Sequence, residues 1–156
     1  MSKKYKGIWF YGNSGTGKSL ASKYVNKLFK NSILLDGDQI RKYVSFDLGY
    51  SIKDREIQIK RVFGMAKLAR ESNIFPVVST VYMNSIIKNK LKKKNILVVN
   101  ILRDFDKIKN RKNIYNSKIN NVIGKDIKNP MLKNKLHIIN NKTVEEFYKK
   151  ISKIIL

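Results

Sequence analysis

Short apolar runs alternate along the chain with longer segments in which apolar residues recur at helical spacing. Residues 8–11 are apolar and β-prone and stop at a glycine, and residues 20–29 then place apolar side chains on one helical face. The same contrast predicts further strands at residues 33–35, 75–81, 96–102 and 136–139, and further helices through Arg41 and at residues 53–72 and 144–156. Five strands that alternate with helices predict an α/β fold, a three-layer α/β/α sandwich around a mainly parallel five-stranded sheet, with ligands at the carboxyl ends of the strands.

Two segments outside the strands carry signals of their own. Thr143 and Glu146 stand at the N-cap and capping-box positions of the closing helix. Residues 110–132 have little regular pattern and are too long for an ordinary connection, which makes them a candidate lid.

Composition narrows the class of protein. The length of 156 residues and an apolar fraction of 42% predict one compact domain over residues 1–156 rather than a disordered basic chain. The absence of cysteine excludes a disulfide framework, a thiolate zinc site and a cysteine nucleophile, and it fits a reducing compartment, so we expect a cytoplasmic protein. No apolar run approaches the roughly 18 residues that cross a bilayer, and no signal-type cleavage site follows the first residues, so we expect no membrane partner and no processing.

Positive charge is the most unusual feature of the composition. The 34 Lys and Arg side chains exceed the 11 Asp and Glu side chains by 23. The lysines are spread over the whole chain together with many Asn and Ile, which is the pattern of a compositional bias, and no RNA-binding signature, zinc-finger spacing or basic zipper accompanies them. We therefore do not expect nucleic acid as the partner, whereas a basic surface can equally steer small anionic substrates.

One segment matches a phosphate-binding motif over its whole length. Between the first strand and its helix, the pattern G-x-x-x-x-G-K-[ST] is satisfied by Gly12, Asn13, Ser14, Gly15, Thr16, Gly17, Lys18 and Ser19. Glycines let successive backbone N–H groups turn toward a phosphate, the helix N-terminus adds positive potential, and the lysine reaches the β- and γ-phosphates. The motif predicts binding of a nucleoside triphosphate, with Ser19 as a ligand of Mg²⁺.

An acidic pair follows the second strand. Asp36 and Asp38 flank Gly37 where the fold brings side chains up to the γ-phosphate and Mg²⁺. One carboxylate there can accept the proton of an attacking hydroxyl, and one can bind Mg²⁺ directly or through its water shell. The spacing does not divide these roles, and Asp38 could instead cap the short helix through Arg41.

The phosphate loop and the acidic pair belong to a longer series of motifs. The series comprises residues 12–19, 35–41, 47–51, 54–55 and 124–127. In order and spacing these segments resemble the adenylylsulfate kinase family over most of the chain. The resemblance implies a P-loop kinase fold and transfer of the γ-phosphate of ATP, with Mg²⁺, to the ribose 3′-hydroxyl of a small nucleotide, adenylyl sulfate. From the resemblance we also expect a homodimer.

The resemblance assigns roles to individual residues. It implies that Lys18, Asp36 and Asp38 take part in the chemistry, with Ser19 and Asp36 at the metal. It also implies that Arg41 and Arg55 bind the acceptor's anionic groups, for which the planar fork of arginine is suited, and that Tyr50 stacks on the acceptor base. The other positions that it places around the substrates are Gln58, Val122, Ile123, Gly124 and Lys112, the last of which reaches a phosphate from the lid.

Three positions depart from the family pattern. Gln58 stands where the family has Asn, Val122 where it has a second stacking Phe, and Val81-Tyr82-Met83 where it has I-S-P. All three lie around the acceptor, so transfer to a 3′-hydroxyl is better supported than the adenine base. Tyr82 also replaces a serine sometimes proposed as a phosphorylated intermediate, which favours direct in-line transfer.

Other acceptors and other classes of protein stay open at this point. A branch of the family phosphorylates cytidine diphosphoramidate, a precursor in capsule biosynthesis, and a smaller pyrimidine would fit the departures. A small-metabolite kinase on the same scaffold and a basic nucleic-acid-binding protein with a phosphate loop are more distant alternatives.

Overall fold

The computed structural model describes residues 4–109, 113–128 and 136–156. In this part of the chain one sheet contains β1 Ile8–Tyr11, β2 Ser32–Asp36, β3 Phe75–Thr80, β4 Leu97–Leu102 and β5 His137–Ile139. Every pair of neighbouring strands is parallel, and the spatial order is β2-β3-β1-β4-β5. β1 therefore lies at the centre, where the strand order reverses and where open α/β sheets bind ligands beyond the carboxyl ends of their strands.

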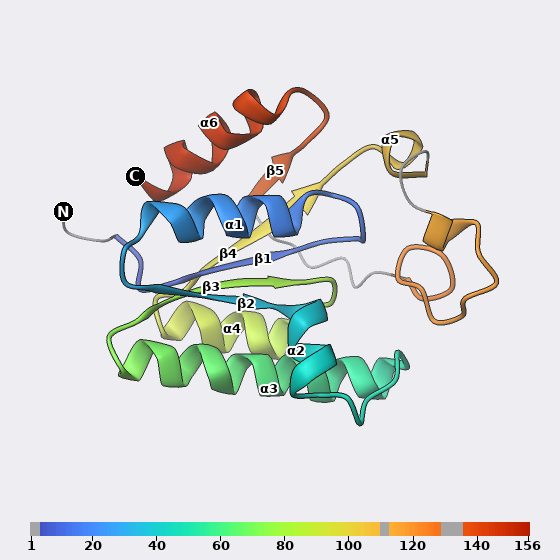
Figure 1. Cartoon of the computed structure of the whole chain (residues 1–156), viewed down its shortest axis with the longest axis horizontal. Coiled ribbons are helices and arrows are strands. Elements are labelled where there is room, and N and C mark those ends of the chain that lie inside the picture. Colours follow the sequence, from blue (N-terminus) through green and yellow to red (C-terminus); the bar gives the residue numbers. More distant parts are fainter. Residues whose placement is uncertain (1–3, 110–112, 129–135) are drawn as a thin grey trace.

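Helices cover both faces of the sheet. They are α1 Lys18–Leu28, α2 Gly37–Tyr43, α3 Ile52–Glu71, α4 Ser85–Lys93, α5 Phe105–Lys109 and α6 Val144–Ile155, with the 3-10 helix η1 Asn113–Tyr115. Figure 1 shows α1 and α6 on one face and α3 and α4 on the other. This arrangement confirms the predicted α/β/α sandwich. None of the helices in the described ranges has both the length and the hydropathy needed to span a bilayer.

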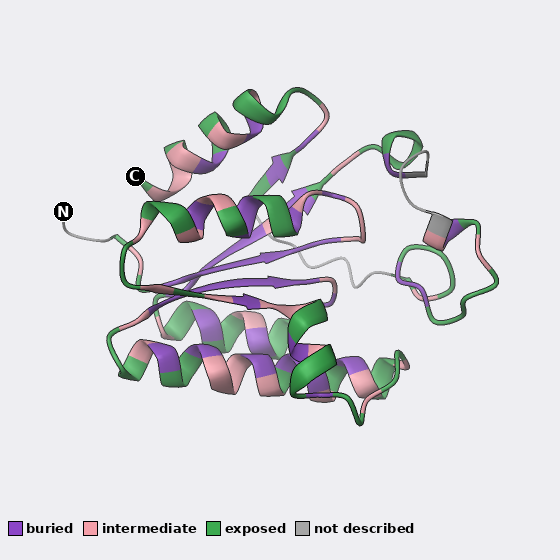
Figure 2. Ribbon diagram, viewed as in Figure 1, coloured by how far each residue is buried: buried purple, intermediate pink, exposed green. Residues whose placement is uncertain are grey.

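The central strands β1 and β3 bury both of their faces, as Figure 2 shows for the centre of the sheet. Successive residues of a strand point to opposite sides, so the apolar run of β1 divides between two cores. Trp9 and Tyr11 pack with apolar side chains of α3 and α4, whereas Ile8 and Phe10 pack with those of α1 and α6. This burial on both sides holds the end of β1, and the loop that follows it, in a fixed place.

Polar side chains cap the beginnings of several helices. Asp36 caps α2 by accepting the backbone N–H groups of Asp38 and Gln39. The alternative in which Asp38 caps this helix is wrong, because Asp38 already lies inside α2 and a capping side chain belongs to the residue before the helix. The predicted cap of α6 is confirmed, since Thr143 accepts the N–H of Glu146. At the start of α3, Ser51 and Asp54 form a capping box.

The candidate lid falls only partly within the described residues. Its described part, residues 113–128, contains η1 and an isolated bridge between Ile123 and Ile127. Tyr115 and Val122 form a small apolar cluster with Ile108 of α5. This cluster anchors the segment beside the carboxyl edge of the sheet.

Candidate active site

A cavity of about 560 Å³ opens at the carboxyl edge of the sheet, a size that suits a small-molecule ligand. The sequence-predicted residues that line it are Ser14, Gly15, Gly17, Lys18, Ser19, Asp36, Asp38, Arg41, Tyr50, Arg55, Gln58, Val122 and Ile123. The predicted residues that lie off its wall are Gly12, Asn13, Thr16 and Gly124. Lys112 lies outside the described residues. The structure thus joins the predicted phosphate loop and the predicted acceptor residues around one cavity.

Glycines give the phosphate loop a backbone that other residues could not adopt. Gly12 and Gly17 have φ angles of 149° and 104°. A Cβ atom on Gly12 would lie 2.3 Å from the carbonyl oxygen of Ile101, and one on Gly17 would lie 2.5 Å from Nδ2 of Asn140. The loop can therefore lie against β4 and the end of β5 only because these positions carry no side chain.

Side chains from the loop and from the far end of the chain hold it in shape. Nδ2 of Asn140, just after β5, donates a hydrogen bond of 2.8 Å to the carbonyl oxygen of Thr16. Nζ of Lys18 donates to the carbonyl oxygen of Asn13 at 2.7 Å, and Lys18 is only 8% exposed. The lysine ammonium is therefore kept inside the loop, where a phosphate would bind. Sequence reasoning missed Asn140, because only the fold brings it to the loop.

Both carboxylate oxygens of Asp36 are engaged. Oδ2 accepts hydrogen bonds from Oγ of Ser19 at 3.0 Å and from Oγ of Ser79 at 2.8 Å. Oδ1 accepts the N–H groups of Asp38 at 3.0 Å and Gln39 at 3.5 Å. Asp36 thus links the phosphate loop, β3 and the start of α2, which suits a residue that supports a metal ion from behind Ser19.

Asp38 has a different environment, although it is only two residues away. It is exposed and lines the cavity, and its carboxylate accepts no hydrogen bond from the residues that the structure describes. A carboxylate that accepts no local hydrogen bond can accept a proton from a ligand hydroxyl. The two aspartates therefore differ in their surroundings, since Asp36 is held by hydroxyls and N–H groups whereas Asp38 is open to the cavity.

Arg55 is a buried cation at the acceptor side of the cavity. It is 8% exposed, and its guanidinium donates to the carbonyl oxygens of Tyr50 at 3.1 Å and Asn121 at 2.8 Å. Among the described residues no carboxylate forms an ion pair with it. Burial and the neighbouring guanidinium of Arg41 lower the pKa of Arg55 from its ordinary value. The charge of Asp38 acts in the opposite direction without forming an ion pair. Because a buried charge that no carboxylate contacts is costly, an anionic ligand would be favoured here.

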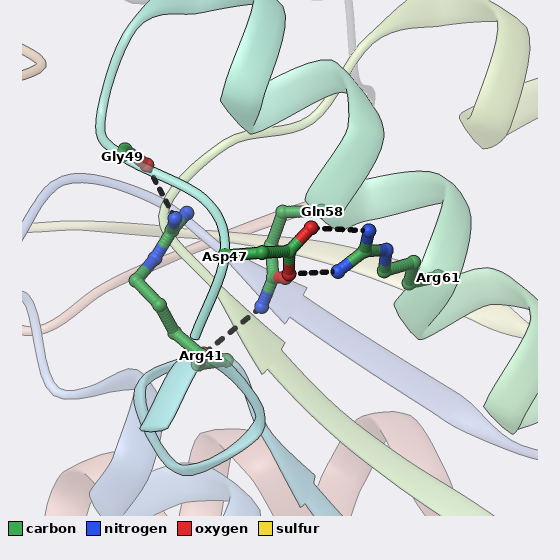
Figure 3. A network of polar contacts seen from close by, with 6 residues as sticks. Arg41, Asp47, Gly49, Gln58 and Arg61 are labelled. Carbon is green, nitrogen blue, oxygen red and sulfur yellow. Dashed lines mark hydrogen bonds and ion pairs between the residues drawn. The ribbon is translucent and has the colours of Figure 1, made fainter. Parts of the chain in front are cut away.

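Tyr50 stands beside both arginines with about half of its surface exposed. The guanidinium carbons of Arg41 and Arg55 lie 4.5 Å and 5.5 Å from the centre of its ring. Arg41 also donates to the carbonyl oxygen of Gly49, as Figure 3 shows. Such contacts orient the ring while leaving surface on which a nucleotide base can stack.

An ion pair holds the loop that carries Tyr50. Arg61 of α3 contacts both carboxylate oxygens of Asp47 through its two terminal nitrogens (Figure 3). The hydrogen bond from Arg61 lowers the pKa of Asp47 below its ordinary value. Since the planar guanidinium fits a carboxylate in two places, this pair fixes the loop more firmly than a single contact would. Arg61 thus helps to position this loop from 14 residues away in the sequence.

Gln58 offers the cavity an acceptor. It is 6% exposed, and its Nε2 donates to the carbonyl oxygen of Gly37 at 3.2 Å. Its Oε1 is buried without a hydrogen-bond partner among the described residues. Buried polar atoms are nearly always paired, so this oxygen suits a donor group of a bound ligand.

The described part of the lid is attached to the phosphate loop. The hydroxyl of Tyr115 donates a hydrogen bond of 2.8 Å to the carbonyl oxygen of Ser14. Burial of Tyr115 raises the pKa of its hydroxyl. Gly124, at φ 88°, lies so close to Asn13 that a Cβ atom would come within 2.9 Å of Asn13 Nδ2. The lid and the loop are therefore coupled by direct contact.

Replacing Tyr115 with phenylalanine should weaken this coupling. A hydrogen bond of this kind contributes about 1 kcal/mol, so we expect about a fivefold loss of affinity for ATP in the Tyr115→Phe variant, measured by calorimetry. Tyr148→Phe makes the same chemical change on α6, where the ring stacks on Tyr24, and should leave the affinity unchanged. Equal affinities in the two variants would show that the contact does not hold the lid.

Comparison with known proteins places this site in a family. The family model described as Adenylylsulphate kinase matches residues 4–126, more than half of the chain. The adenylyl-sulfate kinase of Buchnera aphidicola subsp. Acyrthosiphon pisum is 38% identical over 100 residues, which are 59% of this chain and 48% of that protein. The enzyme of the same name from Prochlorococcus marinus is 36% identical over 97 residues, 60% and 47% of the two chains. The chain thus spans about half the length of the curated relatives it matches.

Solved structures agree on the fold. The APS kinase CysC of Mycobacterium tuberculosis, solved in complex with AMPPNP and APS, superposes with a TM-score of 0.85 at 22% identity and covers 96% of each chain. The shikimate kinase of Acinetobacter baumannii, in complex with shikimate, superposes with a TM-score of 0.61 at 14% identity over 95% of this chain and 89% of that one. The second comparison shows that the scaffold alone does not select an acceptor. It is the match of the family model over most of the sequence that shows that this chain belongs to the adenylylsulphate kinase family.

Proposed function

We propose that the chain is an ATP-dependent kinase that transfers the γ-phosphate to the ribose 3′-hydroxyl of adenylyl sulfate. The observation that carries the proposal is one cavity that combines a phosphate loop, an exposed carboxylate at Asp38 and the buried cation Arg55. These are the groups needed for a triphosphate donor, a reacting hydroxyl and an anionic acceptor.

The residues around the phosphate loop fit the cofactor Mg²⁺. Ser19 and Asp36 present only oxygen atoms, which are the donors that Mg²⁺ prefers. In this proposal Ser19 holds the ion and Asp36 accepts the hydrogen bond of the Ser19 hydroxyl. Mg²⁺, when bound, supplies positive charge that offsets the charge developing on the phosphates.

The reaction follows from the placement of the other residues. Lys18 contacts the terminal phosphates, Arg41 and Arg55 bind the anionic groups of the acceptor, and Tyr50 stacks on its base. The 3′-oxygen forms a bond to the γ-phosphorus as the bond from that phosphorus to the β,γ-bridging oxygen breaks. Asp38 accepts the hydroxyl proton, and ADP leaves with the bridging oxygen. In-line transfer of this kind requires positioning and charge stabilisation and no covalent enzyme intermediate.

The relatives favour adenylyl sulfate over the alternative acceptor. The proteins of Buchnera and Prochlorococcus named above are adenylyl-sulfate kinases, and the Mycobacterium structure contains APS. Nothing in the cavity requires the smaller base of cytidine diphosphoramidate. Val122, which stands where the family has a stacking Phe, is buried against Ile108 and Tyr115 and still contributes to the wall.

Initial rates of 3′-phosphorylation, followed by mass spectrometry of the nucleotide product, test the proposal. Adenylyl sulfate and cytidine diphosphoramidate should be compared at equal concentration with saturating ATP and Mg²⁺. We expect adenylyl sulfate to be preferred by at least about tenfold, about 1.4 kcal/mol of transition-state stabilisation. The 3′-deoxy analogue of adenylyl sulfate is the control and should give no product. The opposite preference would make cytidine diphosphoramidate the acceptor. If neither acceptor gave a product, the proposed function would be overturned.

A further inference from the structure

We propose that Ser79 is a positioning residue for the metal ion. Its hydroxyl fixes the carboxylate of Asp36 so that Asp36 accepts the hydrogen bond of Ser19 and does not itself bind Mg²⁺. This inference rests on the proposed function, because it requires Mg²⁺ and a nucleotide at the phosphate loop.

The sheet register brings the two side chains together. Asp36 and Ser79 are partners in the parallel pairing of β2 with β3, so both side chains leave the same face at the carboxyl end of their strands. Ser79 is 3% exposed and lies in the cavity wall, and its Oγ donates to Oδ2 of Asp36 at 2.8 Å. A hydroxyl that is buried and held by the register keeps one geometry.

The acceptor capacity of Asp36 explains what this geometry achieves. A carboxylate oxygen offers about two lone-pair sites, and those of Oδ2 are taken by the hydroxyls of Ser79 and Ser19. Oδ1 is occupied by the N–H groups at the start of α2. Direct binding of a cation by Asp36 would therefore require that a hydroxyl hydrogen bond be broken. Ser19, in contrast, donates a hydrogen bond to Asp36 and keeps its own lone pairs for a cation.

Loss of the Ser79 hydroxyl should change the metal dependence of nucleotide binding. Without it, one site on Oδ2 becomes empty and the carboxylate can turn away from Ser19. Partners behind a metal ligand typically affect metal affinity by about 10- to 100-fold. A residue with only a structural role would instead lower stability, or weaken nucleotide binding equally with and without the metal.

The test is calorimetry of ADP binding to the full chain with Mg²⁺ and with EDTA, which gives the factor by which Mg²⁺ strengthens binding. We expect this factor to fall by about tenfold in Ser79→Ala and to be retained in Ser79→Thr, which keeps the hydroxyl. Ser45→Ala is the matched control, because Ser45 is fully buried and its hydroxyl has no hydrogen-bond partner among the described residues. The control should keep the wild-type factor.

The outcomes separate this inference from the proposed function. A wild-type protein that does not bind ADP with Mg²⁺ would overturn the proposed function, and this inference with it. Normal wild-type binding with an unchanged factor in Ser79→Ala, or with an equal fall in Ser45→Ala, would overturn the role of Ser79 alone. Thermal unfolding checks that each variant is folded. If Ser79→Ala shows no cooperative transition, Ser79→Cys, a weaker donor of similar size, should show the same fall to a smaller degree, and an unchanged factor there would also overturn the inference.

Discussion

Replacing Lys18 with alanine should lower the rate of phosphoryl transfer at saturating ATP by about 10²- to 10³-fold, and to a greater extent than it lowers ATP affinity. The reason is the place of the ammonium, which lies inside the phosphate loop at the cavity wall and is 8% exposed. A fixed cation stabilises charge that develops on the phosphate most strongly where water is excluded. Single-turnover rates with radiolabelled ATP measure the effect.

The matched control for this prediction lies on the same helix. Lys23 is an exposed lysine of α1, so Lys23→Ala removes one positive charge without touching the cavity and should keep the wild-type rate. Thermal unfolding of both variants should stay cooperative. Full activity of Lys18→Ala would contradict the assignment of residues 12–19 as the donor site.

The pattern of the sequence predicted the sheet well, because each strand is a short apolar run between polar segments. β1 appears at the predicted residues, and its four side chains are all buried. The pattern did not predict α4. Its buried residues Ile87 and Leu91 stand among lysines, so the segment resembles a run of charge, although Asn84 caps it by accepting the N–H of Ile87. When apolar residues are sparse, the buried face of a helix is not recognisable from the sequence pattern.

In the site, some residues are recognisable from their local spacing, whereas others are brought together only by the fold. The phosphate loop and the pair Asp36 and Asp38 are local, so spacing alone identified them. Ser79 and Asn140 are distant, and they reach the site only through the order of the strands, 43 and 124 residues from the groups that they contact. The roles proposed for the two aspartates could not be divided from the sequence, since the proposed division depends on hydroxyls that the fold brings to Asp36.

That division leads to the sharpest contrast between variants. Asp38→Asn should lower kcat by about 10²- to 10⁴-fold, the contribution of a positioned general base, while affinity for ADP with Mg²⁺ changes little. Asparagine has nearly the same shape but cannot accept the proton of the 3′-hydroxyl. Asp38 neither caps α2 nor accepts a hydrogen bond from the described residues, so the fold should be unaffected. Steady-state rates at varied acceptor, with calorimetry of ADP binding, separate the two effects.

Asp36→Asn is the contrasting variant, because it makes the same chemical change two residues away. Asp36 accepts hydrogen bonds from Ser19, Ser79 and the start of α2, and an asparagine keeps only one carbonyl oxygen for these four donors. Asp36→Asn should therefore lose Mg²⁺-dependent ADP affinity and thermal stability, which Asp38→Asn should retain. An unchanged kcat in Asp38→Asn would remove that residue from the chemistry. Equal losses of ADP affinity in both variants would show that the aspartates share one role at the metal, in which case the proton of the hydroxyl must leave by another route.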